Sequence, residues 1–272
     1  MKKRIFIIII FIFIFLLIFG TMYIYSNNKN QDSADKLKEK ADVEIDYLSE
    51  TIIAMMSELN NVQITDEQNS ITNMNQNDIS TLTNLDKKTD WNAFKKDVEN
   101  MYQTWNTVII DLNGLGLKQE NLLKFTTYLG NITNAMQNKN KKSAMYNLAD
   151  LYSLIDGYTK EYSNDNKRII LTDVKSDILY SYALIEDQNW KEMKKYIQKS
   201  QTTYSELMNS TMQSELNPIN VNKAYILINE LSKSIDFKNK DVFYINYKNL
   251  MNELDIMAWR CFLKTYIYFN NN

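Results

Sequence analysis

Residues that could catalyse a reaction or bind a metal are scarce in this chain. It contains no histidine and a single cysteine, Cys261. Without histidine, Ser-His-Asp and Cys-His catalysis, the Glu-x-x-His di-iron pattern and the usual zinc sites are excluded. The apolar neighbours Trp259, Phe262 and Leu263 indicate that Cys261 is a buried residue and not a reactive thiol. We therefore expect no enzyme and no cofactor, and no residue is assigned as catalytic, cofactor-binding or metal-ligating.

Two remaining patterns have simpler interpretations as helix ends. Gly114-x-Gly116 lacks the preceding strand, third glycine and Lys-Ser/Thr pair of a phosphate-binding loop, which favours a helix cap. A group of carboxylates brackets a predicted break between helices, without the spacing of a calcium loop. We expect these carboxylates to be solvated helix ends: Asp156, Glu161, Asp165 and Asp173.

Aromatic side chains are abundant, with 18 Tyr, 4 Trp and 11 Phe. Many tyrosines recur at helical spacing, which favours core and boundary positions over an aromatic binding groove. The segment 257–269 is apolar almost all round, with only Arg260 and Lys264 charged. This segment is either buried between other helices or in contact with a membrane or a partner.

The first 25 residues predict a membrane anchor. Lys2, Lys3 and Arg4 precede an apolar run over residues 5–25, which as a helix would be about 32 Å long, close to the thickness of a bilayer core. Basic residues favour the cytoplasmic side, so residues 1–4 are predicted to be a cytoplasmic tail and the rest of the chain extracytoplasmic. The alternative is a cleaved signal peptide, although no A-x-A-like cleavage site follows the apolar run.

Composition restricts the fold of the remaining chain. The net charge of −2 provides no basic surface for nucleic acid. One proline and five glycines in 272 residues are typical of long helices and argue against an all-β domain or an α/β enzyme with many tight turns. We therefore predict an all-α fold.

Apolar periodicity divides the extracytoplasmic part into three regions. Residues 32–59 form a predicted juxtamembrane amphipathic helix, and residues 60–89 are a polar linker or long loop. Residues 90–270 are predicted to form six or seven antiparallel helices joined by short polar tips. Spacing alone does not distinguish an open superhelix of hairpins from a closed bundle.

An internal repeat is present in the helical region. The segment beginning Asp90-Trp91 aligns with the segment beginning Asn189-Trp190, 99 residues later, and similar polar tips lie halfway between and beyond. The predicted period is therefore about 50 residues, one helical hairpin per unit. Resemblance among unrelated amphipathic helices is the alternative explanation.

Several of these residues resemble a known family. The pattern is Trp91-x-x-Phe94 … Trp105, Leu129 … Ile132, a charged tip, and Leu148-Ala149-x-Leu151 … Leu154. It resembles an uncharacterised family of small membrane-anchored helical-hairpin proteins of Gram-positive spore-forming bacteria. The resemblance covers about residues 90–162, the anchor and the helix after it, and a second copy could begin at Lys167. It implies an architecture but no activity, and this chain differs in its greater length and in its polar 60–89 stretch.

The hypothesis for function follows from these features. We expect a single-pass cell-membrane protein that contacts the lipid bilayer through residues 5–25. Its extracytoplasmic domain would bind or position another cell-envelope protein without chemistry. The alternative is a helical sensor or carrier domain for a small molecule or cell-wall fragment.

Overall fold

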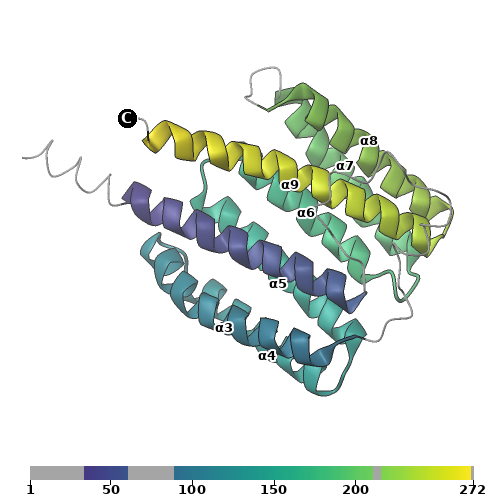
Figure 1. The fold of residues 1–272 in the computed structure, drawn as a ribbon, viewed down its shortest axis with the longest axis horizontal. Helices are drawn as coiled ribbons and strands as arrows, with labels where there is room; N and C mark the ends of the chain where they lie inside the picture. Colours follow the sequence, from purple (N-terminus) through teal and green to yellow (C-terminus); the bar gives the residue numbers. More distant parts are fainter. Residues whose placement is uncertain (1–33, 61–88, 211–215, 271–272) are drawn as a thin grey trace, which may run out of the picture.

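The computed structural model describes residues 34–60, 89–210 and 216–270, and all regular structure within them is helical (Figure 1). A helix over residues 34–59, called helix 34–59 below, comes first. It is followed by α3 (Trp91–Gly114), α4 (Gln119–Gln137), α5 (Lys141–Tyr162), α6 (Asn166–Ala183), α7 (Trp190–Ser210), α8 (Pro218–Asp236) and α9 (Lys240–Asn270). The prediction of an all-α fold is confirmed for these described residues.

The predicted membrane anchor falls on residues that the structure does not describe. Residues 1–4 and 5–25, and residues 61–88 of the predicted linker, fall outside the described residues. Within the described ranges, no helix combines the length and the apolar character needed to cross a membrane.

Short polar side chains fix where the helices begin. The Asp90 carboxylate accepts hydrogen bonds from the backbone N–H groups of Asn92 and Ala93 at 3.0 and 3.2 Å. Asn140 caps α5 and Asp165 caps α6 in the same way. Such caps satisfy N–H groups that have no partner inside the helix. The only proline, Pro218, lies in the first turn of α8, where it does not interrupt helical hydrogen bonds.

The helices form two four-helix bundles that pack together through α5 and α6 and share one continuous hydrophobic core. In the first bundle, α3 packs against α4 and α4 against α5, while helix 34–59 contacts α3 and α5. In the second, α6 packs against α7, α7 against α8, α8 against α9, and α9 back against α6. The α3–α4 pair lies at one side of the molecule and the α7–α8 pair at the other, with α5, α6, α9 and helix 34–59 between them (Figure 1).

Helix 34–59 is therefore an integral part of the first bundle. Its apolar face is fully buried, from Ala41 through Leu48 to Leu59. Lys40 Nζ lies 2.7 Å from Asp111 Oδ2 of α3. A Cβ atom at Gly114 would lie 3.0 Å from Leu37 Cδ2, so the absence of a side chain at Gly114 permits this close approach.

The two bundles have equivalent cores. Buried positions of α3, α4 and α5 recur 99 residues later in α7, α8 and α9. In α3 they are Phe94, Val98, Met101, Trp105 and Val108, and in α7 they are Met193, Ile197, Ser200, Tyr204 and Leu207. In α4 they are Leu122, Phe125, Leu129, Ile132 and Ala135, and in α8 they are Val221, Ala224, Ile228, Leu231 and Ser234. Three of the four helices of each bundle are therefore repeated at this spacing.

The hairpin tips show the same duplication. Lys139 after α4 and Lys238 after α8 both have positive φ, at 50° and 52°. The next residue donates its N–H to a carbonyl five positions earlier, Asn140 to Ala135 and Asn239 to Ser234. This pattern is a Schellman motif. Both asparagines then accept an N–H from three residues ahead and so begin the following helix.

Candidate binding surfaces

Most tyrosines of the described residues are buried or half-buried, as their helical spacing predicted. Tyr152, Tyr182, Tyr204, Tyr244 and Tyr247 are among the largest fully buried side chains. Tyr182 of α6 stacks on Tyr247 of α9 with ring centroids 4.0 Å apart. Aromatic pairs of this kind contribute about 0.5–1.5 kcal/mol beyond the burial of their area. The Tyr182–Tyr247 pair thus holds α9 against α6 in the second bundle.

Five charged side chains form a continuous chain across α5, α6 and α7. Lys160 Nζ lies 2.7 Å from Asp156 Oδ2 and 3.0 Å from Asp173 Oδ2. Lys199 Nζ lies 2.9 Å from Asp177 Oδ1 and 3.6 Å from Asp173 Oδ1. The expectation of solvated carboxylates was wrong for Asp156, which is buried because its turn of α5 faces the neighbouring helices. In the described ranges, no group of three or more His, Cys, Asp or Glu side chains could hold a metal ion.

Asp177 is the most buried carboxylate of this chain of charges, at 2% exposure, and the sequence analysis did not single it out. Burial raises the pKa of Asp177 to about 6, although the ammonium group of Lys199 opposes the shift. Asp173 and Asp156 also raise it. The native state therefore binds a proton at Asp177 more tightly than the unfolded state does.

Replacing Asp177 with asparagine should increase stability at neutral pH. The pKa of Asp177 is 3.8 in the unfolded state and about 6 in the folded state. Its favourable contribution to the free energy of unfolding is therefore fully present below pH 3.8 and is lost as the pH rises through 6. The difference in unfolding free energy between Asp177→Asn and wild type should be about 1–3 kcal/mol in favour of the variant at pH 7.5 and should shrink at pH 4.5. Urea denaturation at the two pH values measures it. A difference independent of pH would contradict the assigned titration.

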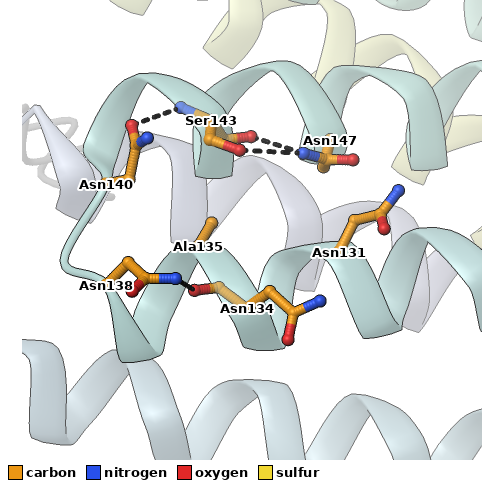
Figure 2. A pocket seen from close by; sticks show the side chains of 7 residues that line it. All are labelled: Asn131, Asn134, Ala135, Asn138, Asn140, Ser143 and Asn147. Atoms are coloured by element: carbon orange, nitrogen blue, oxygen red, sulfur yellow. Dashed lines mark hydrogen bonds between the residues drawn. The ribbon is translucent and has the colours of Figure 1, made fainter.

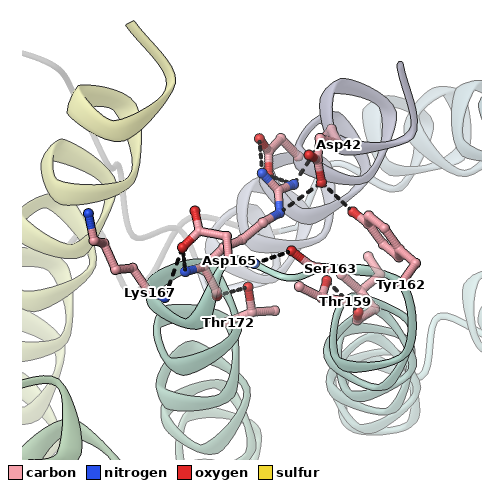
Figure 3. Close-up of polar contacts among 10 residues, drawn as sticks. Asp42, Thr159, Tyr162, Ser163, Asp165, Lys167 and Thr172 are labelled. Carbon is pink, nitrogen blue, oxygen red and sulfur yellow. Dashed lines mark hydrogen bonds and ion pairs between the residues drawn. The ribbon is translucent and has the colours of Figure 1, made fainter. Parts of the chain in front are cut away.

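A second polar cluster joins the two bundles at Arg168, the third residue of α6. Figure 3 shows this region, with Asp42 of helix 34–59 facing Tyr162 of α5. The Arg168 guanidinium donates from Nη2 to Asp46 Oδ1 at 2.6 Å and to the Asp42 carbonyl at 2.9 Å, and from Nη1 to Asp46 Oδ2 at 3.2 Å. Tyr162, the last residue of α5, donates its hydroxyl to Asp42 Oδ1 at 2.7 Å. Burial lowers the pKa of Arg168, but Asp46 and Asp42 outweigh this effect and keep the side chain charged. This cluster fixes helix 34–59 to α5 and α6.

An exposed apolar stripe runs along the outer face of α8 and ends at Phe237, the residue that caps the end of this helix. Ile219, Ile226 and Phe237 are 74%, 59% and 74% exposed. Their spacing of 7 and 11 residues places them within about 20° of one another around the helix, since each residue turns it by about 100°. We call these three residues the α8 stripe.

An open pocket lies between the end of α4 and the start of α5 (Figure 2). Its volume is about 340 Å³, at the lower end of the range for ligand pockets. Its lining side chains are all small or neutral: Asn131, Asn134, Ala135, Asn138, Asn140, Ser143 and Asn147. We call this pocket the asparagine groove. Apolar periodicity predicts only a polar tip here, although five asparagines lie between residues 131 and 147.

The two patterns read from sequence as helix ends have structural roles. Gly114 is the last residue of α3, and Gly116 follows it with φ of 93°. Asp165 caps α6 through the N–H groups of Lys167 and Arg168. Neither position contributes to the asparagine groove or the α8 stripe.

The described residues thus form a tandem of two four-helix bundles. Comparison with protein-family models, with curated proteins and with solved structures finds no match. The resemblance to the membrane-anchored helical-hairpin family therefore stays a prediction from sequence.

Proposed function

We propose that this protein is tethered to the cell membrane by residues 5–25 and holds another cell-envelope protein at the extracytoplasmic surface without catalysing a reaction. The observation that supports this proposal is the α8 stripe. Three large apolar side chains exposed along one face are unfavourable in water unless a partner covers them, and exposed apolar side chains that share a face are a feature of protein interfaces.

The duplicated bundle provides an internal comparison for the stripe. The positions 99 residues before Ile219, Ile226 and Phe237 carry Glu120, Thr127 and Asn138. All three polar residues are exposed, as expected for the outer face of a bundle helix. The outer face of α8 thus differs from its duplicate in the way a binding surface would.

The stripe is suited to an elongated partner surface. It extends over 18 residues, or about 27 Å along the helix. Glu230 and Lys233 pair with each other at 2.7 Å between Ile226 and Phe237, so they add little net charge. A partner with an apolar groove or helix face of similar length would cover the stripe and leave this ion pair at the polar rim.

In-cell crosslinking tests the proposal. A photoreactive residue at Asn222, which is exposed beside the stripe, should crosslink one envelope protein in stoichiometric yield. The double variant Ile226→Thr and Phe237→Asn, which carries the residues of the first bundle, should reduce that yield at least about tenfold, because central apolar anchors dominate interface energy.

Leu123→Asn is the matched control. Leu123 is 51% exposed on α4, and its duplicate is Asn222, so the variant removes an exposed apolar residue from the other bundle. It should leave the crosslink unchanged. Loss of the crosslink in both variants, or in neither, would argue against the α8 stripe as the interface.

A further inference from the structure

We infer that the asparagine groove binds the backbone of an extended, uncharged peptide segment. The groove lies on α4 and α5 of the first bundle, whereas the α8 stripe belongs to the second. The inference is therefore independent of the proposed function and adds a second binding site.

The lining chemistry matches a peptide unit. Apart from Ala135, the lining residues carry only amide or hydroxyl groups, so the groove has no charge to attract an ion. A primary amide has an N–H donor and a carbonyl acceptor, the same pair that each peptide unit offers. One asparagine can thus bind the N–H and C=O of a passing chain whatever its side chains are.

Two of the asparagines are available for such contacts. Asn131 and Asn134 are exposed, and their side chains form no hydrogen bond with other described residues. The other amides are only partly engaged. Asn138 Nδ2 donates to the Asn134 carbonyl at 2.9 Å, and Asn147 Nδ2 donates to the Ser143 carbonyl at 2.7 Å (Figure 2). Both retain a carbonyl oxygen that can accept.

The equivalent positions of the second bundle are arranged differently. Asn246, the duplicate of Asn147, donates across from α9 to the carbonyl of Glu230 on α8 at 3.1 Å. Asn147 instead bonds within its own helix and leaves the space between α4 and α5 unbridged. The duplicates of Asn131 and Asn134 are Glu230 and Lys233, which form an ion pair.

The dimensions favour a peptide over a sugar. Asn131, Asn134 and Asn138 extend over about 10.5 Å of α4, the length of about three residues of extended chain. No aromatic side chain lines the groove, so the apolar face of a sugar ring would have nothing to stack on. A neutral, amide-lined slot of this length recognises an extended backbone.

Affinity selection on the full chain in detergent micelles tests this inference. The probe is a library of capped, uncharged octapeptides, and N-acetylglucosamine disaccharide is the competing probe. Wild-type protein should retain peptides, and the variant Asn131→Glu with Asn134→Lys, which carries the residues of the second bundle, should bind them at least tenfold more weakly. Side-chain amide resonances of Asn131 and Asn134 should shift on addition of a retained peptide.

Two further variants complete the test. Asn131→Ala with Asn134→Ala should also lose binding, which excludes an effect of the introduced charges alone. Asn222→Glu, at an exposed asparagine of α8, should bind as wild type does. Absence of any retained peptide, binding that tolerates both groove variants, or preference for the disaccharide would each overturn the inference. Thermal melts of all variants should coincide, because the altered side chains are exposed.

Discussion

Replacing Tyr182 with alanine is expected to lower the free energy of unfolding by about 3–5 kcal/mol, the usual loss for a large aromatic in a core. Tyr182 is fully buried in α6. Its ring stacks on Tyr247 at 4.0 Å and meets Tyr244 edge-on at 5.8 Å, both on α9. Its hydroxyl faces the Met56 carbonyl of helix 34–59 at 3.4 Å. The resulting cavity would lie where both bundles meet, and urea denaturation of the full chain measures the loss.

The variant Tyr182→Phe is the control. It keeps the ring and removes only a long hydrogen bond, so its effect should be about 1 kcal/mol or less. Equal stability of Tyr182→Ala and wild type would contradict the packing of α9 against α6 that closes the second bundle.

Replacing Arg168 with alanine should destabilise the protein by about 2–3 kcal/mol. The change removes the bidentate pair with Asp46 and the contact with Asp42, and it leaves both carboxylates without their cation. Asp46 is half exposed, so water recovers part of the loss. Because this cluster joins helix 34–59 to α6, limited proteolysis should cleave the variant in helix 34–59 faster than wild type.

Two further variants separate charge from geometry. Arg168→Lys keeps the positive charge but loses the planar fork, and it should fall between alanine and wild type. Lys167→Ala changes the neighbouring residue, whose ammonium forms no ion pair with the described residues, and should have little effect. If Arg168→Ala behaves like Lys167→Ala, the cluster does not hold helix 34–59.

Local apolar periodicity was sufficient to predict most of the helices. Helical spacing of apolar residues predicts one core stripe from Val98 to Val108 and another from Leu148 to Ile155, and the stripe residues are buried. In α4 the same spacing from Leu122 predicts Thr126 and Met136 as core residues, but the structure buries their neighbours Phe125 and Ala135 instead. A stripe identifies the buried face of a helix to within about one residue, because several adjacent positions share that face.

The closure into two bundles could not be predicted, because it depends on contacts between residues far apart in the chain. The Arg168 contacts with Asp42 span 126 residues, and no local pattern indicates them. The 99-residue alignment that begins at Trp91 and Trp190 did identify the duplication. It could not distinguish a repeated hairpin from a repeated bundle, since both have the same helices and the same short tips.

The candidate sites were missed for different reasons. Asp177 lies on α6, where buried residues surround much of the helix, so its sequence neighbours give no sign of its burial. The asparagine groove depends on the side-chain direction of Asn147, which turns toward its own helix while its duplicate Asn246 reaches across. A rotamer choice of this kind is decided by packing and not by residue type.

The way helix 34–59 is held also determines how the protein would respond to tension. A membrane anchor before residue 34 would apply its pull at the first turn of this helix. Its buried residues, from Ala41 to Leu59, contact the rest of the first bundle along the whole length of the helix. An axial pull therefore loads these contacts in parallel, as a shear, and does not peel them apart one after another. A lateral pull would instead load first the contacts nearest the start of the helix, Leu37 against Gly114 and Lys40 with Asp111, and then the Arg168 cluster. Resistance to force should therefore depend on its direction.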